Sequence, residues 1–286
     1  MTRTLSRLVL AAVALTLAAT AAPAETLRPK FDPDRFTRGQ AVDNKYFPLR
    51  PGTTSVLRGR GFEDGERIRE KSVLRVLDRP GPRILGVRTT IHLDKAFENG
   101  RLVEKTFDYF AQDNRGNVWY LGEDVTNYRY DDQGNLIGTD SESAWRAGRR
   151  GARPGWIMPA RQVIGQRYFQ ERARRDEALD KGQTHAVLGR LRVGDKVYRN
   201  VLRVLETNPF EPGAREFKFY APKVGLIRVE EGLNRNLKKP DIVFERTKTR
   251  RERAAAASKG GKRSDDGARR SAKGGKRGGD KGGRRR

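Results

Sequence analysis

Four acidic side chains are the residues of this sequence whose types and spacing could do chemistry. Glu123 and Asp124 are adjacent, while Asp108 and Glu216 each lie beside aromatic residues. Two carboxyl groups can act as general acid and general base when their surroundings push their pKa values apart, and carboxylate oxygens also bind hard cations. These four are the catalytic candidates, and an enzyme that uses them must bring them into one pocket. In the alternative interpretation, Glu123-Asp124 ends a strand and Glu216 pairs with Lys218 or a cross-strand arginine.

The residues that the chain lacks exclude several classes of protein. It has no cysteine, which excludes disulfide scaffolds, zinc fingers and thiol enzymes. Its two histidines, His92 and His185, are too few for a multi-histidine metal site, and no Gly-x-Ser-x-Gly elbow accompanies them. We interpret both as structural or surface residues and predict neither a metal nor a cofactor. Asp131–Asn135 begins like a calcium loop, but Leu136 stands where that loop needs glycine, so a hairpin turn is predicted.

Aromatic residues are the candidates for ligand binding. Pointing inward between packed sheets, they would simply fill a core. Lining an open, curved sheet, they would form an apolar groove for a lipid or another hydrophobic small molecule. The candidates are Tyr109, Trp119, Tyr120, Phe217 and Tyr220, to which Trp145, Trp156 and Phe219 add further aromatic surface.

The elements that must position these residues are short runs rich in Val, Ile, Thr, Tyr and Phe between Gly, Pro, Asn and Asp. This pattern is typical of antiparallel strands and turns, and Asn99-Gly100 is a strong hairpin dipeptide. We predict an all-β domain built as a single curved sheet, half barrel or sandwich. The segment 148–159 is predicted as a loop and 171–180 as a short helix or loop. The predicted strands are 53–60, 67–77, 84–93, 101–112, 117–121, 168–173, 185–193, 196–206, 216–221, 224–230 and 241–246, with a turn at 80–82.

Strand alternation predicts which side chains share a face. Glu216, Lys218 and Tyr220 should share one face, and Phe217 and Phe219 the other. Asp108 should lie on the same face as Phe110, which is uncommon for a carboxylate on a fully solvated surface, so Asp108 could line a cavity.

The first twenty-four residues are predicted to be a cleaved secretory signal peptide. Arg3 and Arg7 precede the apolar run 8–22, and Ala22-Pro23-Ala24 supplies the small residues of a cleavage site. The run is shorter than the roughly 20 apolar residues of a membrane span, and no second run approaches that length. We therefore expect a periplasmic or secreted protein without a transmembrane segment in its mature chain, with an extended lead-in over 25–52 and the β domain over 53–247.

The segment 248–286 is predicted to be a disordered basic tail. It holds sixteen of the chain's 61 Lys and Arg residues and only four acids, and without apolar residues it cannot offset its ordering entropy. Such a polycation binds polyanions by counterion release, so an anionic envelope surface is the expected partner and nucleic acid is a less favoured one. The alternative is a solvated tail with no partner. The predicted anion-binding residues are Lys262, Arg263, Lys276, Arg277, Arg284, Arg285 and Arg286.

Three blocks of sequence resemble a widespread family of bacterial exported proteins of uncharacterised function. They are Val42–Thr54, Tyr109–Asp124 and Glu211–Leu226, in the same order as in that family. The resemblance implies a β-rich extracytoplasmic domain, and it brings no reaction and no catalytic residue. Lys223 stands where the family pattern has glycine, and the basic tail is an addition to that pattern. A lipid-carrier-like half barrel is an analogy of fold alone.

The leading hypothesis is a non-enzymatic exported β-protein that binds a ligand or the envelope, attached to anionic surfaces by its tail. The alternative is a carboxylate-based hydrolase or metal-dependent enzyme using Asp108, Glu123, Asp124 or Glu216. A third hypothesis is a structural envelope component held by protein contacts, which would need a large exposed apolar patch.

Overall fold

The computed structural model describes residues 25–37, 39, 41–63 and 65–251. They belong to one compact unit of the chain. The predicted signal peptide lies outside the described residues, and so does the predicted tail beyond Arg251. Among the described residues no helix is long and apolar enough to span a membrane.

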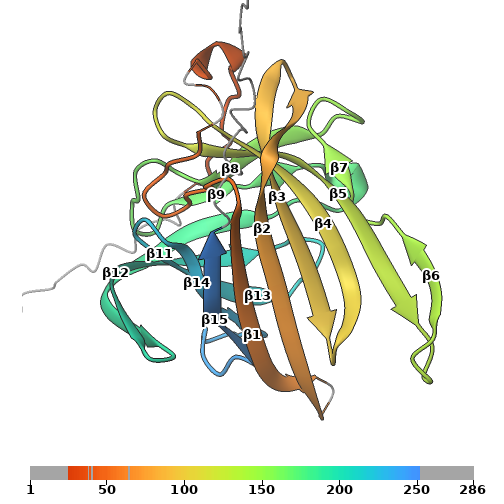
Figure 1. The fold of residues 1–286 in the computed structure, drawn as a ribbon. Helices are drawn as coiled ribbons and strands as arrows, with labels where there is room; N and C mark the ends of the chain where they lie inside the picture. The colour runs from red at the N-terminus through yellow and green to blue at the C-terminus, as the bar shows by residue number, and fades with distance from the viewer. Residues whose placement is uncertain (1–24, 38, 40, 64, 252–286) are drawn as a thin grey trace, which may run out of the picture. The chain divides into compact units, whose positions relative to one another are not determined.

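The chain forms one antiparallel sheet of fifteen strands, which confirms the predicted all-β class and its single curved sheet (Figure 1). The helices described are two single 3₁₀ turns, η1 (Pro33–Arg35) and η2 (Arg174–Asp176). The strands are β1 (Thr53–Glu63), β2 (Glu66–Ile84), β3 (Val87–Glu98), β4 (Arg101–Gln112), β5 (Val118–Tyr130), β6 (Leu136–Asp140), β7 (Trp145–Arg146), β8 (Arg153–Met158), β9 (Arg167–Phe169), β10 (Glu171–Arg172), β11 (Lys181–Val193), β12 (Lys196–Thr207), β13 (Arg215–Ala221), β14 (Gly225–Glu231) and β15 (Ile242–Arg251).

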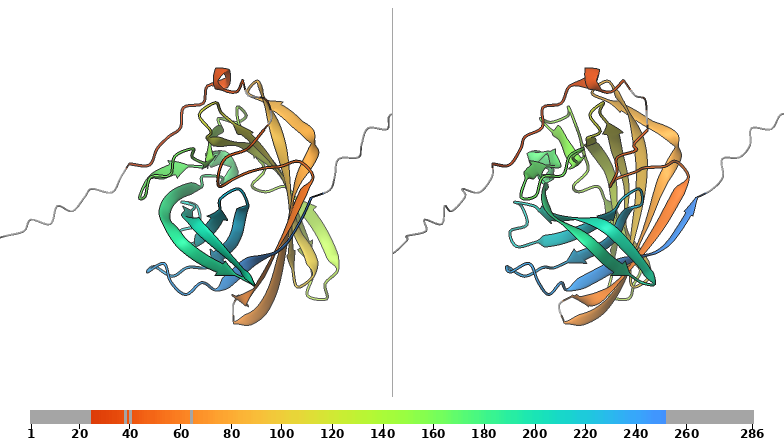
Figure 2. Two further views of the ribbon diagram at one scale, coloured as in Figure 1. Left: turned by 60° about the vertical axis from the view of Figure 1, so that its left-hand side comes forward. Right: turned by 90° about the vertical axis from the view of Figure 1, so that its left-hand side faces the viewer.

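The sheet is nearly closed into a barrel (Figure 2). Its strand order runs β10-β8-β5-β4-β3-β2-β1-β15-β14-β13-β12-β11-β9, with β6 and β7 paired to β5 outside this path. The two end strands of the order, β9 and β10, are consecutive in sequence, and Gln170 alone separates them. A single buried residue therefore connects the two ends of the sheet.

Four details differ from the sequence predictions. Strand β8 occupies part of 148–159, where a loop was predicted, because Pro154 and Gly155 lie in the second strand of the order, beside the two-residue end strand β10, where few ladder hydrogen bonds are needed. The predicted turn at 80–82 is wrong: β2 continues through these prolines at two register shifts, and the turn lies at Leu85-Gly86. Segment 171–180 forms β10 and η2. Strand β15 continues to Arg251, four residues into the segment predicted as tail.

Two turn positions agree with the sequence. Asn99 and Gly100 both have positive φ, 47° and 92°, as the predicted hairpin turn requires. Lys223, which stands where the resembled family has glycine, has a φ of 63°, the left-handed conformation that glycine adopts most easily. Its backbone N–H donates to the Lys45 carbonyl, 2.6 Å away, and so ties the turn to the lead-in segment 25–52.

Gly155 is the residue that lets the sheet close. A Cβ at this position would overlap the carbonyl oxygen of Phe169 and would lie 2.7 Å from the carbonyl carbon of Gln170. Because both neighbours are backbone atoms, they cannot move aside as a side chain would. The segment that joins β9 to β10 thus crosses β8 at the one position of that strand without a side chain.

We predict that Gly155→Ala lowers the free energy of unfolding by roughly 1–3 kcal/mol, the usual range for overpacking. Urea unfolding followed by circular dichroism measures this change. The matched control is Gly189→Ala on β11, where a Cβ would meet nothing within 4 Å, and its effect should stay within about 0.5 kcal/mol. Equal stability of the two variants would contradict this account of closure.

Candidate functional site

A cavity of about 540 Å³ lies against the inner face of the curved sheet. Part of its wall is apolar and comes from Phe47 and Leu49 of the lead-in segment and from the inner faces of the strands. Its charged lining residues are mainly acidic. The apolar lining also includes Leu57, Leu74, Val76, Phe110, Leu226, Val229 and Phe244.

Ten carboxyl groups line this cavity, although the whole chain has a net charge of +25. The cationic lining residues are Lys218 and Arg246, with His92 as a further ionisable group. The acidic residues are Asp94, Asp108, Glu123, Glu171, Glu177, Asp180, Glu206, Glu211, Glu216 and Glu231. The inside of the sheet therefore has the opposite charge character to the chain as a whole.

One polar group spans strands β3, β4 and β5. His92, Asp108 and Glu123 are cross-strand partners in register, and His92 Nδ1 lies 3.4 Å from Asp108 Oδ2. The Tyr120 hydroxyl lies 2.6 Å from Asp108 Oδ1 and 2.8 Å from Glu123 Oε2. A phenol has a single hydrogen to donate, so one of the two carboxyl groups must be protonated for both short contacts to be hydrogen bonds.

We assign this proton to Glu123, because its pKa is raised. Burial and the nearby Asp108 charge raise its pKa to about 8, against a smaller opposite effect of the Tyr120 hydrogen bond. A protonated Glu123 donates to the Tyr120 oxygen, and Tyr120 then donates to the Asp108 carboxylate. The result is a directed hydrogen-bond chain across two strands.

A β-bulge places Tyr120 and Glu123 on one face of β5. Tyr109 pairs with Gly122 and Phe110 with Tyr120, so one extra residue interrupts the alternation between them. Gly122 has a φ of 145°, and a Cβ there would lie 2.6 Å from the Trp145 carbonyl oxygen. The bulge therefore needs glycine, and it moves Glu123 rather than Asp124 to the cavity face.

Asp124 points away from the cavity. It accepts a hydrogen bond of 2.6 Å from the Tyr109 hydroxyl and forms an ion pair with Arg146, whose guanidinium lies 4.7 Å from the centre of the Tyr109 ring. The adjacent acids Glu123 and Asp124 thus lie on opposite faces and do not form one carboxyl pair.

A second polar group lies on β12 and β13 and on the segment that closes the sheet. Lys218 Nζ lies 2.6 Å from Glu206 Oε2 and 3.0 Å from Glu216 Oε1, and Gln170 Nε2 donates to Glu206 Oε1 at 2.8 Å. The Asp180 backbone N–H donates to Glu171 Oε1 at 2.8 Å. These contacts hold the closing segment against the cavity wall.

Burial raises the pKa values of five of the ten cavity carboxyl groups, those of Asp94, Glu123, Glu171, Asp180 and Glu216. For Asp94 and Glu216 the pKa is about 7, and His92 and Lys218 respectively oppose part of the shift. For Asp180 burial raises the pKa to about 6, and for Glu171 burial and the Asp180 charge also raise the pKa. Several of these groups therefore change charge near neutral pH.

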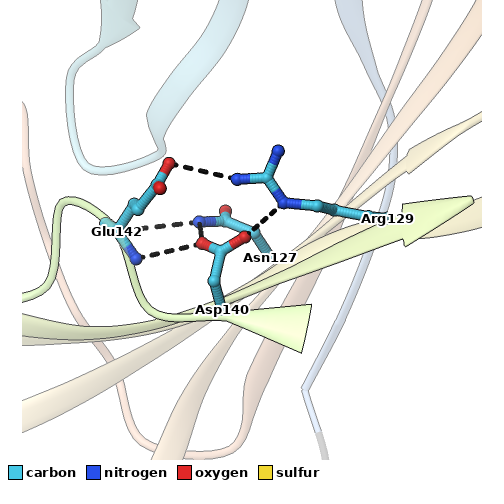
Figure 3. Close-up of polar contacts among 4 residues, drawn as sticks. All are labelled: Asn127, Arg129, Asp140 and Glu142. Atoms are coloured by element: carbon cyan, nitrogen blue, oxygen red, sulfur yellow. Dashed lines mark hydrogen bonds and ion pairs between the residues drawn. The ribbon is translucent and has the colours of Figure 1, made fainter. Parts of the chain in front are cut away.

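A surface carboxylate shows the opposite behaviour (Figure 3). Asp140 accepts hydrogen bonds from Asn127 and Arg129 at 2.8 and 2.6 Å, and Arg129 also contacts Glu142 at 3.2 Å. The bonds from Asn127, the Glu142 backbone N–H and Arg129 lower the Asp140 pKa to about 2. The described carboxyl groups with raised pKa values thus line the cavity. The outer cluster of Asn127, Arg129, Asp140 and Glu142 supplies control residues for experiments on the cavity.

Asp94 has an unsatisfied oxygen in the cavity wall. Its Oδ1 is buried and has no hydrogen-bond partner among the described residues. A buried carboxylate oxygen without a donor is costly, so a ligand that supplies a donor would be stabilised there. No described group of three or more His, Asp and Glu side chains has a geometry that could hold a metal ion.

The structure brings together some of the sequence candidates. Asp108, Glu123 and Glu216 line the one cavity, as do Tyr120 and Tyr220. The expected faces are confirmed for Asp108 with Phe110 and for Glu216, Lys218 and Tyr220. The catalytic and ligand-binding roles of these residues remain predictions.

Other candidates lie elsewhere. Phe217 packs with Phe219 on the opposite face of β13, and Tyr109 contacts Asp124. Trp119 is buried beside Trp156, and its indole N–H donates to Asp113 Oδ2 at 2.9 Å. The predicted anion-binding residues from Lys262 to Arg286 lie outside the described residues.

His185 also lies away from the cavity lining. Its Nδ1 is 3.0 Å from Arg203 Nη2, and its ring stands edge-on to Phe217, with the centres 4.8 Å apart. Burial and the Arg203 charge lower its pKa. His92, in contrast, lines the cavity.

Sequence reasoning missed several acidic residues of the cavity. Asp94 lies two positions after His92 on β3 and therefore shares its face, and Glu206 on β12 is the cross-strand partner of Glu216 on β13. Strand alternation could therefore have predicted that both acids face the cavity. Glu171 and Asp180 were hidden in the segment interpreted as helix or loop. Their position depends on the closure of the sheet, which has no local signal.

Comparisons with known proteins give the following result. No protein-family model and no curated protein sequence matches the chain. Two solved structures are similar to it, a predicted exported protein with YmcC-like fold from Bacteroides fragilis NCTC 9343 and a predicted lipoprotein from Parabacteroides distasonis ATCC 8503. Each has 12% identity and a TM-score of 0.37, over 73% of this chain and 100% of the other. A likeness of this degree assigns no residue role here.

We predict that stability falls as pH rises and that Glu123→Gln reduces this fall. The Glu123 pKa is about 8 in the folded chain against an ordinary 4.5, so the folded state binds the proton more tightly. Its contribution is complete below pH 4.5 and is lost as the pH rises through 8. Glutamine imitates the protonated acid, so between pH 5 and 8 the variant should lose on the order of 1 kcal/mol less unfolding free energy than the wild type.

Urea unfolding at both pH values measures this difference. The matched control is Asp124→Asn, which removes the adjacent carboxyl group on the opposite face and should lower stability by similar amounts at both pH values. If Glu123→Gln keeps the full pH dependence of the wild type, the assigned proton on Glu123 is wrong.

Proposed function

We propose that this protein is an exported, non-enzymatic binding protein whose cavity takes a small amphipathic molecule with a positively charged group. The observation that carries the proposal is a cavity of about 540 Å³ that combines apolar walls with ten acidic residues. An amine or guanidinium group would contact the carboxyl groups, and a hydrocarbon portion would contact the apolar walls. Export is supported by the signal-peptide pattern of the first twenty-four residues.

The acidic part of the cavity favours a cation over a neutral molecule. Asp94 lies near His92, Asp108 and Lys218, so negative charge on it is opposed both by burial and by Asp108. A ligand cation would favour the charged forms of these acids and would donate to the unpaired Asp94 oxygen. Binding therefore replaces protons on the carboxyl groups by the cation.

The apolar part would hold a hydrocarbon chain. Leu57, Leu74, Val229 and Phe244 pack together as one buried cluster and also line the cavity. Apolar surface removed from water contributes about 25 cal/mol per Å², so a chain placed along this cluster would add affinity without adding charge. The two parts together specify an amphipathic ligand.

We predict that decylammonium binds with a dissociation constant at least about tenfold lower than that of 1-decanol, because charge-assisted hydrogen bonds are stronger than neutral ones. Isothermal titration calorimetry at pH 7, in buffers of different ionisation enthalpy, should also detect proton release. The release follows from the pKa values of about 7 for Asp94 and 8 for Glu123.

Asp94→Asn tests the same site with one atom changed. It should weaken decylammonium binding about tenfold and should change stability little, because a neutral amide replaces a carboxyl group whose charged form burial disfavours. The matched control is Glu142→Gln, whose side chain is 76% exposed on the outer cluster. Equal affinity for the amine and the alcohol, or unchanged amine affinity in Asp94→Asn, would refute a cation site.

We further propose that the basic tail attaches the protein to anionic surfaces. Residues 248–286 have a net charge of +12, from sixteen basic and four acidic residues. Lipid head groups and acidic polysaccharides are the polyanions expected outside the cytoplasm. Attraction of this kind depends on charge number rather than on shape.

Deletion of residues 252–286 should abolish retention on vesicles containing an anionic phospholipid at low salt. This boundary leaves the whole of β15 in place. In the full chain, retention should fall steeply as salt rises, because bound counterions are released on binding. A control in which the tail's Lys and Arg residues become Gln keeps the chain length. If that control is retained as well as the wild type, charge does not drive attachment.

An acid–base enzyme is the second candidate function. The bond chain from Glu123 through Tyr120 to Asp108 favours it, since it holds a protonated and an ionised carboxyl group within reach of one hydroxyl. Native mass spectrometry of the small molecules that copurify with the protein, before and after prolonged incubation, separates the two functions. A ligand recovered unchanged supports a binding protein, and a chemically altered one supports an enzyme.

A further inference from the structure

We propose a second binding site, outside the cavity, that takes a phosphate group. It is a groove of about 690 Å³ lined by Arg28, Lys30, Arg153 and Arg172, with Phe31, Leu85 and small residues between them. We name it the arginine groove. It shares no lining residue with the acidic cavity, so either proposal can fail without the other.

Two arginines of this groove face each other directly. Arg153 on β8 and Arg172 on β10 are cross-strand partners at one end of the sheet. Like charges in this position destabilise a strand pair. Arg28, from the lead-in segment, adds a third guanidinium, whose positive charge lies close enough to lower the Arg172 pKa.

The described lining of the groove contains no acidic residue that would offset this charge. All ionisable residues that line the groove are basic among those the structure describes, and the Arg172 Nε atom is buried without a hydrogen-bond partner. Burial and the charges of Arg153 and Arg28 lower the Arg172 pKa. Arg146 and Arg150, in contrast, have acidic partners: they form ion pairs with Asp124 and Asp176 respectively.

The arrangement fits a tetrahedral oxyanion. A guanidinium offers paired N–H donors that match phosphate oxygens, and three guanidiniums around one groove can neutralise a doubly charged group. Phe31 and Leu85 supply apolar surface next to these donors. The phosphate can belong to free inorganic phosphate, which can carry two negative charges, or to a phospholipid head group, whose phosphodiester carries one; both present tetrahedral phosphate oxygens to the guanidinium groups.

The test measures the melting temperature of the full chain with 10 mM phosphate against chloride of equal ionic strength. Phosphate should raise the melting temperature of the wild type, because it binds the folded state, and it should not raise that of Arg153→Gln/Arg172→Gln. The matched control is Arg190→Gln/Arg199→Gln. It removes another cross-strand arginine pair, which is exposed and lies outside the groove, and it carries the same tail.

Isothermal titration then gives the size of the effect. Phosphate affinity should fall about tenfold or more in the groove variant and stay unchanged in the control. If Arg153→Gln/Arg172→Gln does not fold, Arg28→Gln in the exposed lead-in replaces it with the same expectation. Equal phosphate responses in the wild type, groove variant and control overturn the proposal.

A soluble short-chain phospholipid distinguishes the two sources of phosphate. Dihexanoyl phosphatidylglycerol binding at least tenfold tighter than inorganic phosphate, with the same loss in the groove variant, assigns the groove to a lipid head group. Inorganic phosphate binding as tightly or more tightly assigns it to the free ion. Both results support a phosphate site, whereas binding of either probe without dependence on Arg28, Arg153 or Arg172 refutes one.

Discussion

The closing connection at Gln170 is the constraint on which the rest of the structure depends. It joins β9 to β10, the two ends of the strand order, and its side chain is 1% exposed. Its amide donates to Glu206, which also holds Lys218, so the same residue closes the sheet and orders the polar wall of the cavity. Without this crossing, which Gly155 makes possible, the inner faces of β5 and β13 would not enclose a common space.

The enclosed space explains why acids and bases are distributed unequally in this protein. Burial raises the pKa of Glu123 to about 8 and those of Asp94 and Glu216 to about 7, so protons neutralise part of the charge of the ten cavity acids near neutral pH. Lys218 forms ion pairs with Glu206 and Glu216. Binding of the proposed cation would therefore increase the negative charge of this cluster.

Sequence alternation predicted the inner face of two strands and failed where the strands bend. It placed Asp108 with Phe110 and Glu216 with Lys218 correctly, because the extra residue of the bulge opposite Asp108–Phe110 lies in β5, and β4 and β13 keep their own alternation. It did not predict that Glu123 and Tyr120 share a face, since the bulge at Gly122 depends on the approach of β7. It predicted one strand over 168–173 and did not predict that this segment divides into β9 and β10 at opposite ends of the sheet, because two such short strands have no local periodicity.

Each of the two proposed sites brings like charges together. The repulsion among the carboxyl groups of the cavity is relieved differently from the repulsion among the guanidinium groups of the arginine groove. Carboxyl groups with pKa values between about 6 and 8 can take up protons, so a cation competes with protons and its affinity must rise from pH 6 to pH 8. Guanidinium groups keep their charge over that range. Loss of protons therefore does not reduce the repulsion in the arginine groove, and a bound anion would offset it instead. Between pH 7.5 and 8.5, where phosphate is mainly doubly charged, the affinity of the groove should therefore be nearly constant while that of the cavity still changes.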